Sequence, residues 1–259
     1  AHDYGAVLPG SAPGIAVVDP QEKIRVALIG CGGQGKANLR VFMQQPDTLV
    51  TVVCDPDANR MREAADMAED RYDVRPAEVK DYRNVVTRKD VDVVIVGTPD
   101  HWHAPMAQAA IEAGVHAYVE KPMTHTISET YQLREAVRKN PGAILAVGHQ
   151  HRQTLSFLTA QDAIAKNTLG HVSLVVTNTN RNDDNGAWQY EIHPDASPET
   201  IDWNAFLGTA PQVPFNAEHF FRWRKWWAYG SGLSGDLLTH DYDRINCVLK
   251  MGIPKYVTA

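Results

Sequence analysis

Ionisable side chains gather where apolar runs of this sequence end. One run closes with Glu120, Lys121 and Pro122, the run before it leads into "TPDHWHAP" (98–105), and the run after it leads into "HQHRQ" (149–153). Such runs are typical of buried parallel strands, whose carboxyl ends meet at the edge of an open sheet where ligands bind. A desolvated lysine there could stabilise charge that develops on a substrate oxygen and transfer a proton easily. An exposed ion pair before a turn is the plainer alternative.

A glycine-rich turn lies upstream of these residues. The segment "GCGGQG" places Gly30, Gly32 and Gly35 directly after an apolar run and before a helical pattern. Glycines at this spacing allow a tight turn, a close approach of the backbone to a pyrophosphate, and close packing of helix on strand. The anion would lie at the helix N-terminus, where free N–H groups and the helix dipole favour negative charge. We expect Gly33 and Gln34 to contact the cofactor too.

Asp55 ends the next apolar run, 20 residues after Gly35. A carboxylate at this point can bind the ribose hydroxyls of a dinucleotide, and it repels a 2′-phosphate. NAD is therefore the predicted cofactor and NADP the less favoured one, although Arg60 follows shortly after and could soften that preference. An ordinary glycine turn with a solvated Asp55 is the alternative interpretation.

Two histidine pairs raise the question of a metal site. His101 with His103, and His149 with His151, are each two residues apart, and residues at that spacing share a face of an extended segment. However, the sequence has no HExxH motif and no Cys/His spacing typical of zinc, and a nicotinamide enzyme needs no metal for its redox chemistry. We therefore predict no metal, and we expect most of these histidines to cap strand ends.

A second candidate cluster lies in "GSGLSGDLLTHDYD" (230–243). Asp236 and His240 are four residues apart, so on a helix they share a face and could meet one substrate. Histidine suits proton transfer because its unperturbed pKa lies near neutral pH. A carboxylate that stabilises the helix dipole beside an incidental histidine is the alternative.

Alternating strands and helices must position these residues. The patterns predict strands over 23–30, 49–55, 91–97, 115–120 and 143–148, with helices over 35–45, 57–72, 103–114 and 128–140. Asp57 and Ser128 are the expected N-caps, and Gly114 the expected stop of the third helix. This alternation predicts an α/β fold with a Rossmann-type, doubly wound parallel sheet.

The pattern changes after Gly148. A helix over 154–166, a β-rich stretch over 171–180 and a loop region rich in Trp and Pro to about residue 229 predict a second, α+β domain. We place an N-terminal arm at 1–22, the cofactor domain at 23–149 and the substrate domain at 150–259.

Composition argues against several classes of protein. The 259 residues are 44% hydrophobic, as in globular proteins, and their formal net charge is −6 without a basic block, which argues against a nucleic-acid partner. The longest apolar runs are shorter than the roughly 20 residues of a membrane span. Cys31, Cys54 and Cys247 lack CxxC spacing, so we expect buried thiols rather than disulfides.

Together these motifs resemble the glucose-fructose oxidoreductase / inositol dehydrogenase / MocA family. "GCGGQG", "GTPDHWHAPMAQAAIEAGVHAYVEKPMTHTISE" and "VGHQHR" carry the likeness over residues 23–259, and "WNAFLGTAPQVPF" (203–215) is similar to an exported-type branch. The resemblance implies an NAD(P)-dependent oxidoreductase of a sugar, inositol or polyol that forms homo-oligomers. It also implies a mainly antiparallel open sheet in the second domain. It slightly favours export, and the compartment stays open.

The resemblance also implies residue roles. Lys121, in a Glu-Lys-Pro turn often built with a cis proline, would lie beside the nicotinamide and the substrate hydroxyl. His240 would be the general acid/base, and Asp236 would orient it or bind a neighbouring hydroxyl. The other expected cofactor contacts are Thr98, Pro99, His101, His103, Glu120 and Gln150, and the other expected substrate contacts are Arg152, Trp223, Arg224 and Tyr229.

Two departures from the family pattern leave the activity open. The lead-in "GSGLSGD" lacks the usual double glycine, and the family's second domain normally continues beyond this point, so we expect an incomplete substrate domain. Net oxidation, an NAD-retaining cleavage or epimerisation through a keto sugar, and non-catalytic NAD binding remain alternatives. Aromatic residues between 188 and 229 either face a sugar or fill a core. Arg152 and Arg181 either bind an acidic sugar or are solvated.

Overall fold

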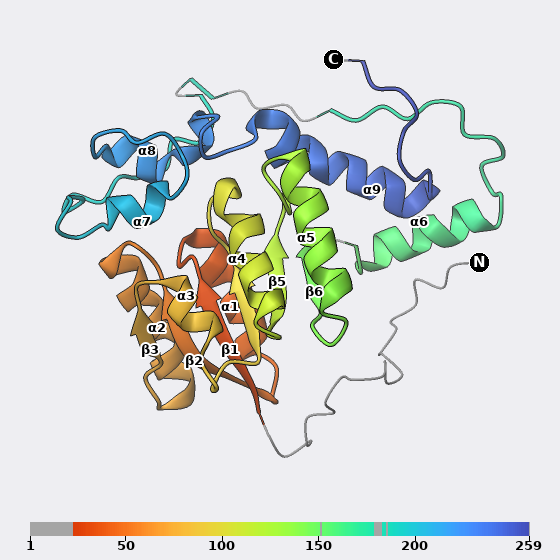
Figure 1. Ribbon diagram of the computed structural model, residues 1–259. Helices are drawn as coiled ribbons and strands as arrows, with labels where there is room; N and C mark the ends of the chain where they lie inside the picture. Colours follow the sequence, from red (N-terminus) through yellow and green to blue (C-terminus); the bar gives the residue numbers. More distant parts are fainter. Residues whose placement is uncertain (1–22, 151, 179–182, 185, 259) are drawn as a thin grey trace.

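Six parallel strands form one sheet in the order β3-β2-β1-β4-β5-β6 (Figure 1). The computed structural model describes residues 23–150, 152–178, 183–184 and 186–258, so the predicted arm at 1–22 lies outside the described residues. The doubly wound parallel sheet is confirmed, and its strand order reverses between β1 and β4, where such sheets bind ligands. The strands are β1 (Ile24–Ile29), β2 (Thr48–Cys54), β3 (Ala77–Val79), β4 (Val93–Val96), β5 (His116–Glu120) and β6 (Leu145–Gly148).

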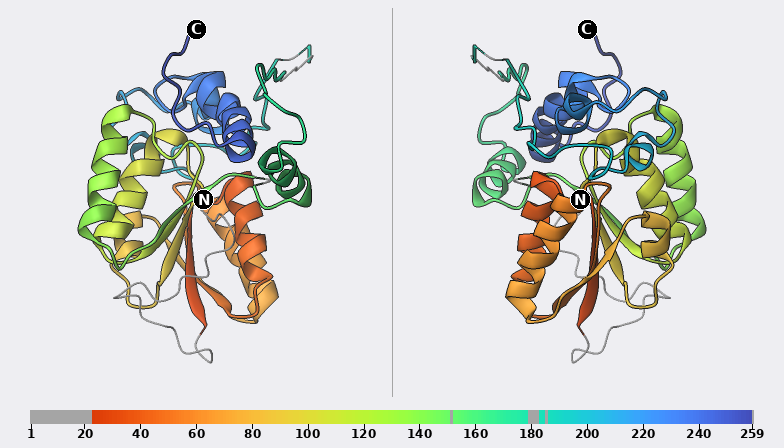
Figure 2. Two further views of the ribbon diagram at one scale, coloured as in Figure 1. Left: turned by 90° about the vertical axis from the view of Figure 1, so that its right-hand side faces the viewer. Right: turned by 90° about the vertical axis from the view of Figure 1, so that its left-hand side faces the viewer.

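Helices cover both faces of the sheet, as Figure 2 shows from the side. Val26 and Leu28 of β1 pack with α1 and α2, whereas Ala27 and Ile29 pack with α3, α4 and α5. Successive strand residues point to opposite faces, so both sets are buried and the strand reads as a continuous apolar run. The helices are α1 (Gly33–Met43), α2 (Ala58–Tyr72), α3 (Tyr82–Val86), α4 (Asp100–Glu112) and α5 (Ile127–Lys139).

Two helix caps test the local predictions. Asp57 caps α2 as predicted, because its side chain accepts from the backbone N–H groups of Asn59 and Arg60. The prediction of Ser128 as a cap is wrong, since Thr126 caps α5 in a reciprocal capping box with Glu129. A threonine followed three residues later by a glutamate satisfies two backbone N–H groups at once, and this start outcompetes the later serine.

Helix α4 begins at Asp100, three residues earlier than predicted. His101 and His103 therefore lie on a helix, where residues two apart do not share a face, and the geometry that suggested a metal-ligand pair is not formed. Within residues that the structure describes, no group of three or more His, Cys, Asp or Glu side chains could hold a metal ion. His151 lies outside the described residues.

In the described part of the chain after β6, the regular secondary structure is helical. It contains α6 (Leu155–Ala165), α7 (Trp203–Leu207), α8 (Ala217–Phe221), the 3-10 turn η1 (Trp223–Lys225), the π-helical turn η2 (Ser234–Leu238) and α9 (Thr239–Leu249). The predicted antiparallel sheet is absent from the described residues, so that prediction is wrong. Residues 171–178 form no strand, because no described segment hydrogen-bonds to their backbone, and Leu174 and Val176 are exposed.

A small apolar cluster anchors this second part to the sheet. Ile201, Trp203, Phe206, Phe220 and Tyr229 are buried together, apart from the two cores that flank the sheet. Figure 1 shows α7 and α8 above the carboxyl edge of the sheet, close to α2, α3 and α4. The contact with the Rossmann part therefore lies at the edge where a cofactor is expected to bind.

Two further features concern membranes and thiols. No helix in the described part of the chain is long and apolar enough to cross a membrane. Cys31 and Cys54 are buried free thiols, as predicted, and Cys247 is half-buried.

Candidate active site

A cavity of about 500 Å³ lies along the carboxyl edge of the sheet. It extends from the glycine turn after β1 to side chains of η2 and α9, so both parts of the chain form its walls. Four of the residues expected in the site do not line it: Gly35, His101, Arg152 and Tyr229. The expected residues that do line it are Gly30, Gly32, Gly33, Gln34, Asp55, Thr98, Pro99, His103, Glu120, Lys121, Gln150, Trp223, Arg224, Asp236 and His240.

The glycine turn fits the phosphates of a dinucleotide. Gly30 has a φ of 92°, and a Cβ there would lie 2.7 Å from the Gly97 carbonyl carbon. A Cβ on Gly35 would lie 1.9 Å from the carbonyl oxygen of Gly30, so this glycine allows α1 to pack on β1. Among the described residues, no side chain caps the N-terminus of α1, and a Cβ on Gly33 would meet nothing within 4 Å. The first N–H groups of α1 thus remain available to an anion.

Asp55 connects the end of β2 to the glycine turn. Its carboxylate accepts from the backbone N–H of Cys31 at 2.6 Å and from that of Asp57 at 2.8 Å. Burial raises the pKa of Asp55 to about 6, although Arg60 and these two N–H groups act in the opposite direction. Asp55 also lines the cavity, so it can hold the turn and face a ribose.

Thr98 supplies an independent sign of a ligand. Its hydroxyl oxygen is buried and has no hydrogen-bond partner in the part of the chain that the structure describes, and the residue lines the cavity. Buried hydroxyls in folded proteins normally have a partner. With the uncapped end of α1 and the open space at Gly33, this orphaned hydroxyl fits a site built for a bound dinucleotide.

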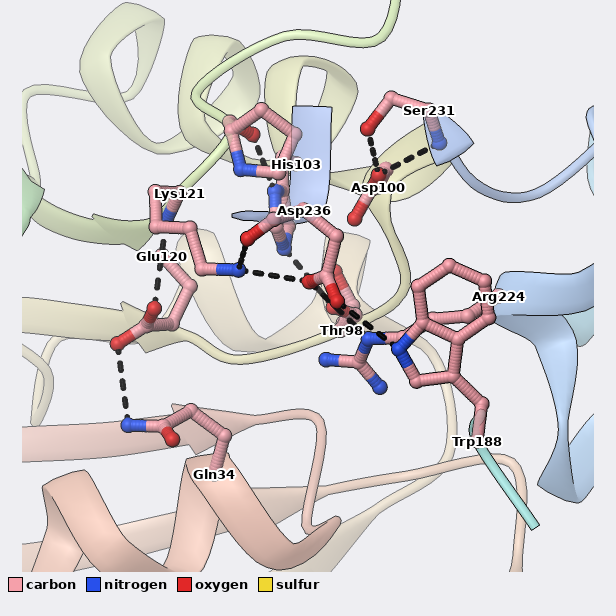
Figure 3. A network of polar contacts seen from close by, with 11 residues as sticks. Gln34, Thr98, Asp100, His103, Glu120, Lys121, Trp188, Arg224, Ser231 and Asp236 are labelled. Atoms are coloured by element: carbon pink, nitrogen blue, oxygen red, sulfur yellow. Dashed lines mark hydrogen bonds and ion pairs between the residues drawn. The ribbon is translucent and has the colours of Figure 1, made fainter. Parts of the chain in front are cut away.

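Glu120 and Lys121 diverge at the end of β5. The buried Glu120 carboxylate accepts from Asn38 Nδ2 at 2.8 Å and from Gln34 Nε2 at 3.4 Å, which joins β5 to α1. Lys121 Nζ donates instead to Asp236, at 2.7 Å to Oδ1 and 2.8 Å to the carbonyl oxygen (Figure 3). Its side chain is only 9% exposed, so it is not a surface lysine. The Lys121–Pro122 peptide is cis, as the resemblance implies.

Asp236 is the centre of a polar network on the π-helical turn η2 (Figure 3). Besides Lys121, Arg224 Nε donates to its Oδ1 at 3.2 Å and Trp188 Nε1 donates to its Oδ2 at 3.1 Å. Burial alone would raise the pKa of this carboxyl, but Arg224 and Lys121 outweigh burial and lower it. Asp236 is therefore a carboxylate that holds two cations in the cavity wall.

His240 lies one helical turn beyond Asp236 and lines the same cavity. Its ring centroid is 6.2 Å from that of His149, and the two rings are perpendicular. Burial, followed by the charge of Lys121 and by His149, lowers the pKa of His240, and burial also lowers the pKa of His149. His149 Nδ1 is 3.7 Å from Asp243. The fold thus places His149, which the sequence marked only as one of the strand-end histidines, beside the candidate acid/base.

Three expected contacts have other partners. His101 Nε2 lies 2.9 Å from the carbonyl oxygen of Phe206, and burial lowers the pKa of His101 to about 4. Tyr229 is buried against the His101 ring, with centroids 5.4 Å apart. Arg152 forms an ion pair with Asp243 at 2.9 Å. Arg181 lies outside the described residues.

Several site contacts have no local sequence signal. Asp100 accepts from the backbone N–H of Ser231 at 2.9 Å and from its hydroxyl at 2.5 Å, across 131 residues of sequence. Arg60 lies over the Phe221 ring at 4.6 Å and 3.7 Å from Asp57. The Asp100–Ser231 and Arg60–Phe221 contacts join distant segments, which no residue spacing could have indicated, whereas Asp57 and Arg60 are local neighbours at the start of α2.

Comparison with known proteins identifies the class that this fold and site define. Residues 24–149 match the family described as "Oxidoreductase family, NAD-binding Rossmann fold". Residues 24–149 therefore form an NAD-binding Rossmann domain of the glucose-fructose oxidoreductase / inositol dehydrogenase / MocA family.

Two curated relatives illustrate the range of the family. A "Glycosyl hydrolase family 109 protein" of Saccharopolyspora erythraea is 35% identical over 146 residues, which cover 52% of this chain and 32% of the relative. The "Uncharacterized oxidoreductase YdgJ" of Escherichia coli is 28% identical over 238 residues, which cover 92% of this chain and 56% of the relative. The matched part of the chain thus spans between a third and just over half of these relatives.

Two solved structures share the fold over most of the chain. GenD2 from gentamicin A biosynthesis, solved in complex with NAD, has a TM-score of 0.63 at 19% identity, covering 93% of this chain and 57% of GenD2. The WlbA dehydrogenase from Bordetella pertussis, solved with NADH and UDP-GlcNAcA, has a TM-score of 0.62 at 19% identity, covering 89% and 56%. Similarity therefore extends beyond the Rossmann sheet.

Proposed function

We propose that this chain belongs to an NAD-dependent oxidoreductase that moves a hydride between the nicotinamide and a sugar, inositol or related polyol. Residues 23–149 form the cofactor domain and 150–259 contribute to the substrate domain of a homo-oligomeric enzyme. The observation that carries the proposal is one cavity lined by the glycine turn, Asp55, the Lys121–Asp236 pair and His240. That combination serves cofactor binding and proton transfer at one place.

Lys121 binds and polarises the reacting hydroxyl. Bound NAD supplies the hydride acceptor. Two N–H groups of the Lys121 ammonium donate to Asp236, and the third can donate to a substrate oxygen. A fixed cation in a half-buried site stabilises negative charge that develops on that oxygen. Asp236 keeps the ammonium in place, so it acts as a positioning residue as well as a wall of the site.

His240 accepts the hydroxyl proton. The lowered pKa keeps its ring neutral at neutral pH, which is the state that a general base needs. His149 lies beside it, at 6.2 Å between ring centroids, and can help to pass the proton on.

NAD is preferred over NADP because of Asp55. A carboxylate at this place repels a 2′-phosphate. Arg60, which could bind that phosphate, lies against Asp57 and the Phe221 ring and is partly neutralised there. The complexes of GenD2 with NAD and of WlbA with NADH support the same choice.

An NAD-retaining glycosidase is the second candidate. Relatives named glycosyl hydrolase family 109 proteins are 30–36% identical over about half of this chain. In such a cycle a sugar hydroxyl is oxidised to a ketone, which acidifies the adjacent C–H and allows elimination of the glycosidic oxygen. Water then adds and the hydride returns, so no net redox change remains. Lys121 and His240 would perform the same proton transfers in this cycle, whereas a non-catalytic NAD-binding protein would not need them.

One set of assays distinguishes these candidates. The purified protein is denatured and the released NAD(H) is quantified, and the native protein is then incubated with NAD and a panel of sugars and glycosides. Stoichiometric NADH formation supports net oxidation. Free sugar released from glycosides without NADH, by a protein that carries near-stoichiometric NAD(H), supports the closed cycle. If the protein forms neither NADH nor free sugar, both activities are contradicted.

Lys121→Ala tests the mechanism common to both. Loss of a charge-stabilising donor should lower kcat about 100-fold or more, while NAD binding is largely retained. Lys36→Ala is the matched control, since Lys36 on α1 pairs with Glu63 and does not line the cavity. Full turnover by the Lys121 variant would disprove the assigned role.

A further inference from the structure

We propose that the sugar substrate carries a carboxylate group and that Arg224 binds it through the two terminal nitrogens of its guanidinium. This inference rests on the proposed function and adds the chemical class of the substrate. The sequence left Arg152 and Arg181 as candidates for an acidic sugar. Arg152 forms an ion pair with Asp243 and does not line the cavity, and Arg181 lies outside the described residues. Arg224 does line the cavity.

Two contacts fix the plane of the Arg224 guanidinium. Its Nε donates to Asp236 Oδ1 at 3.2 Å, and its central carbon lies 4.2 Å from the centroid of the Trp223 ring. The side chain is 22% exposed. Nη1 and Nη2 have no hydrogen-bond partner in the described part of the chain, and Figure 3 shows them projecting past Asp236. The guanidinium of Arg224 is thus held in place, while its two terminal nitrogens remain free to bind a ligand.

The hydrogen-bonding capacity of the surrounding groups selects the ligand. Asp236 already accepts from Lys121 and Arg224 at Oδ1 and from Trp188 at Oδ2. What this wall still offers to a substrate is therefore mainly donors, namely the two terminal nitrogens of Arg224 and the third N–H of Lys121. Hydroxyls of a neutral sugar both donate and accept, whereas a carboxylate only accepts and pairs with a guanidinium through two parallel hydrogen bonds. The excess of donors favours a carboxylate.

The charges of the side chains around Asp236 also favour a carboxylate ligand. Lys121 and Arg224 contribute two positive charges against the single carboxylate of Asp236. Three other acids line the cavity, but each accepts hydrogen bonds elsewhere: Asp55 from backbone N–H groups, Asp100 from Ser231, and Glu120 from Asn38 and Gln34. A local excess of positive charge on largely buried side chains is costly unless a ligand neutralises it. With Lys121 assigned to the reacting hydroxyl, Arg224 remains for an acidic group elsewhere on the ring.

The test compares matched sugar pairs on cofactor-loaded protein. Isothermal titration calorimetry at constant ionic strength measures glucuronate against glucose, galacturonate against galactose and mannuronate against mannose, with the corresponding sugar 6-phosphates in parallel. At least one uronate should bind about tenfold or more tightly than its neutral partner, as expected for a charge-assisted bidentate pair. Arg224→Gln should reduce that difference to about threefold or less, because a neutral amide cannot replace the charge and the two parallel donors of the guanidinium.

Arg222→Gln is the matched control. Arg222 is two residues away, forms an ion pair with Glu218 and does not line the cavity. Its substitution therefore removes the same charge and leaves the Arg224 guanidinium in the cavity. This variant should keep the preference for the uronate. Circular dichroism and NAD content verify the fold of both variants.

Three results would overturn the proposal. They are equal binding of acid and neutral sugar in every pair, an undiminished difference in Arg224→Gln, and tighter binding of a sugar phosphate than of every uronate. Since binding is measured without turnover, failure of the proposed function is a separate result. A protein that binds a uronate through Arg224 but forms neither NADH nor a sugar product would contradict the function and leave the substrate assignment in place.

Discussion

Asp55 combines a structural role with a place in the cavity wall. It accepts from two backbone N–H groups, those of Cys31 and Asp57, and it also lines the cavity. Burial raises its pKa to about 6. A ribose hydroxyl needs an ionised acceptor here, so the protonation of a single side chain should control the affinity for the cofactor near neutral pH.

NAD affinity should fall as the pH decreases through about 6, the pKa of Asp55. If only the ionised form binds the ribose well, one pH unit below the pKa should weaken binding about tenfold. Stability linkage has the opposite sign. A carboxyl whose pKa is raised by folding favours the folded state below its unfolded pKa, and this contribution is lost as pH rises through about 6. Weaker binding at pH 5 would therefore not reflect destabilisation by Asp55.

Fluorescence titration of NADH at pH 5 and pH 7.5 checks this expectation. Asp55→Asn should bind NADH weakly at both values and show little dependence on pH. A wild-type affinity that is equal at the two pH values would contradict the ribose assignment.

Helix α1 can approach β1 closely because of one glycine. A Cβ on Gly35 would lie 1.9 Å from the carbonyl oxygen of Gly30, inside any permitted contact, whereas a Cβ on Gly33 would meet nothing within 4 Å. Both residues belong to the same turn of the same helix. Gly35 faces the strand, whereas Gly33 faces the cavity.

Gly35→Ala should therefore destabilise the fold strongly, and Gly33→Ala should not. Because backbone must shift to admit the methyl group, we expect a loss of about 3 kcal/mol in the free energy of unfolding for Gly35→Ala. Gly33→Ala should change stability by about 1 kcal/mol or less, since alanine favours the helix. Urea denaturation of both variants measures the difference. Equal stabilities would show that α1 does not depend on this close approach.

The first turn of α4 joins the Rossmann part to the second part of the chain. Asp100, only 2% exposed, accepts twice from Ser231, and Trp102 Nε1 donates to the carbonyl oxygen of Phe206 at 2.8 Å. Ser231 lies within residues 223–240, the segment that also contains Arg224, Asp236 and His240. The placement of the substrate wall should depend on it.

Asp100→Ala should loosen that wall. It leaves the Ser231 N–H without its acceptor, which costs about 1–3 kcal/mol when the donor is buried. Hydrogen exchange should rise in residues 223–240, and turnover should fall more than NAD affinity because Lys121 loses its fixed partner. Asp81→Ala, which removes the cap of α3 within the Rossmann part, is the control and should leave exchange in that segment unchanged. Unchanged exchange in the Asp100 variant would argue against the junction.

Local patterns in the sequence determined the Rossmann part. Continuous apolar runs indicated β1, β2, β4, β5 and β6, and glycine spacing indicated the turn before α1, because strand burial and backbone strain depend on residues close in sequence. Strand β3 was missed because three residues, "AEV", are too short to show a pattern. The resemblance led to an antiparallel sheet after β6, and this failed because a strand is defined by its partner.

Only the tertiary structure decided how the candidate site is assembled. Lys121 and Asp236 are 115 residues apart, and the only ion pair that the local sequence offered to Lys121, as an alternative interpretation, was one with the adjacent Glu120. Glu120 instead binds Asn38, and His149 lies beside His240. Bringing such distant residues together costs chain entropy that only the packing of whole elements can offset. Sequence patterns report local preference and burial, and therefore indicated the candidate residues without indicating their partners.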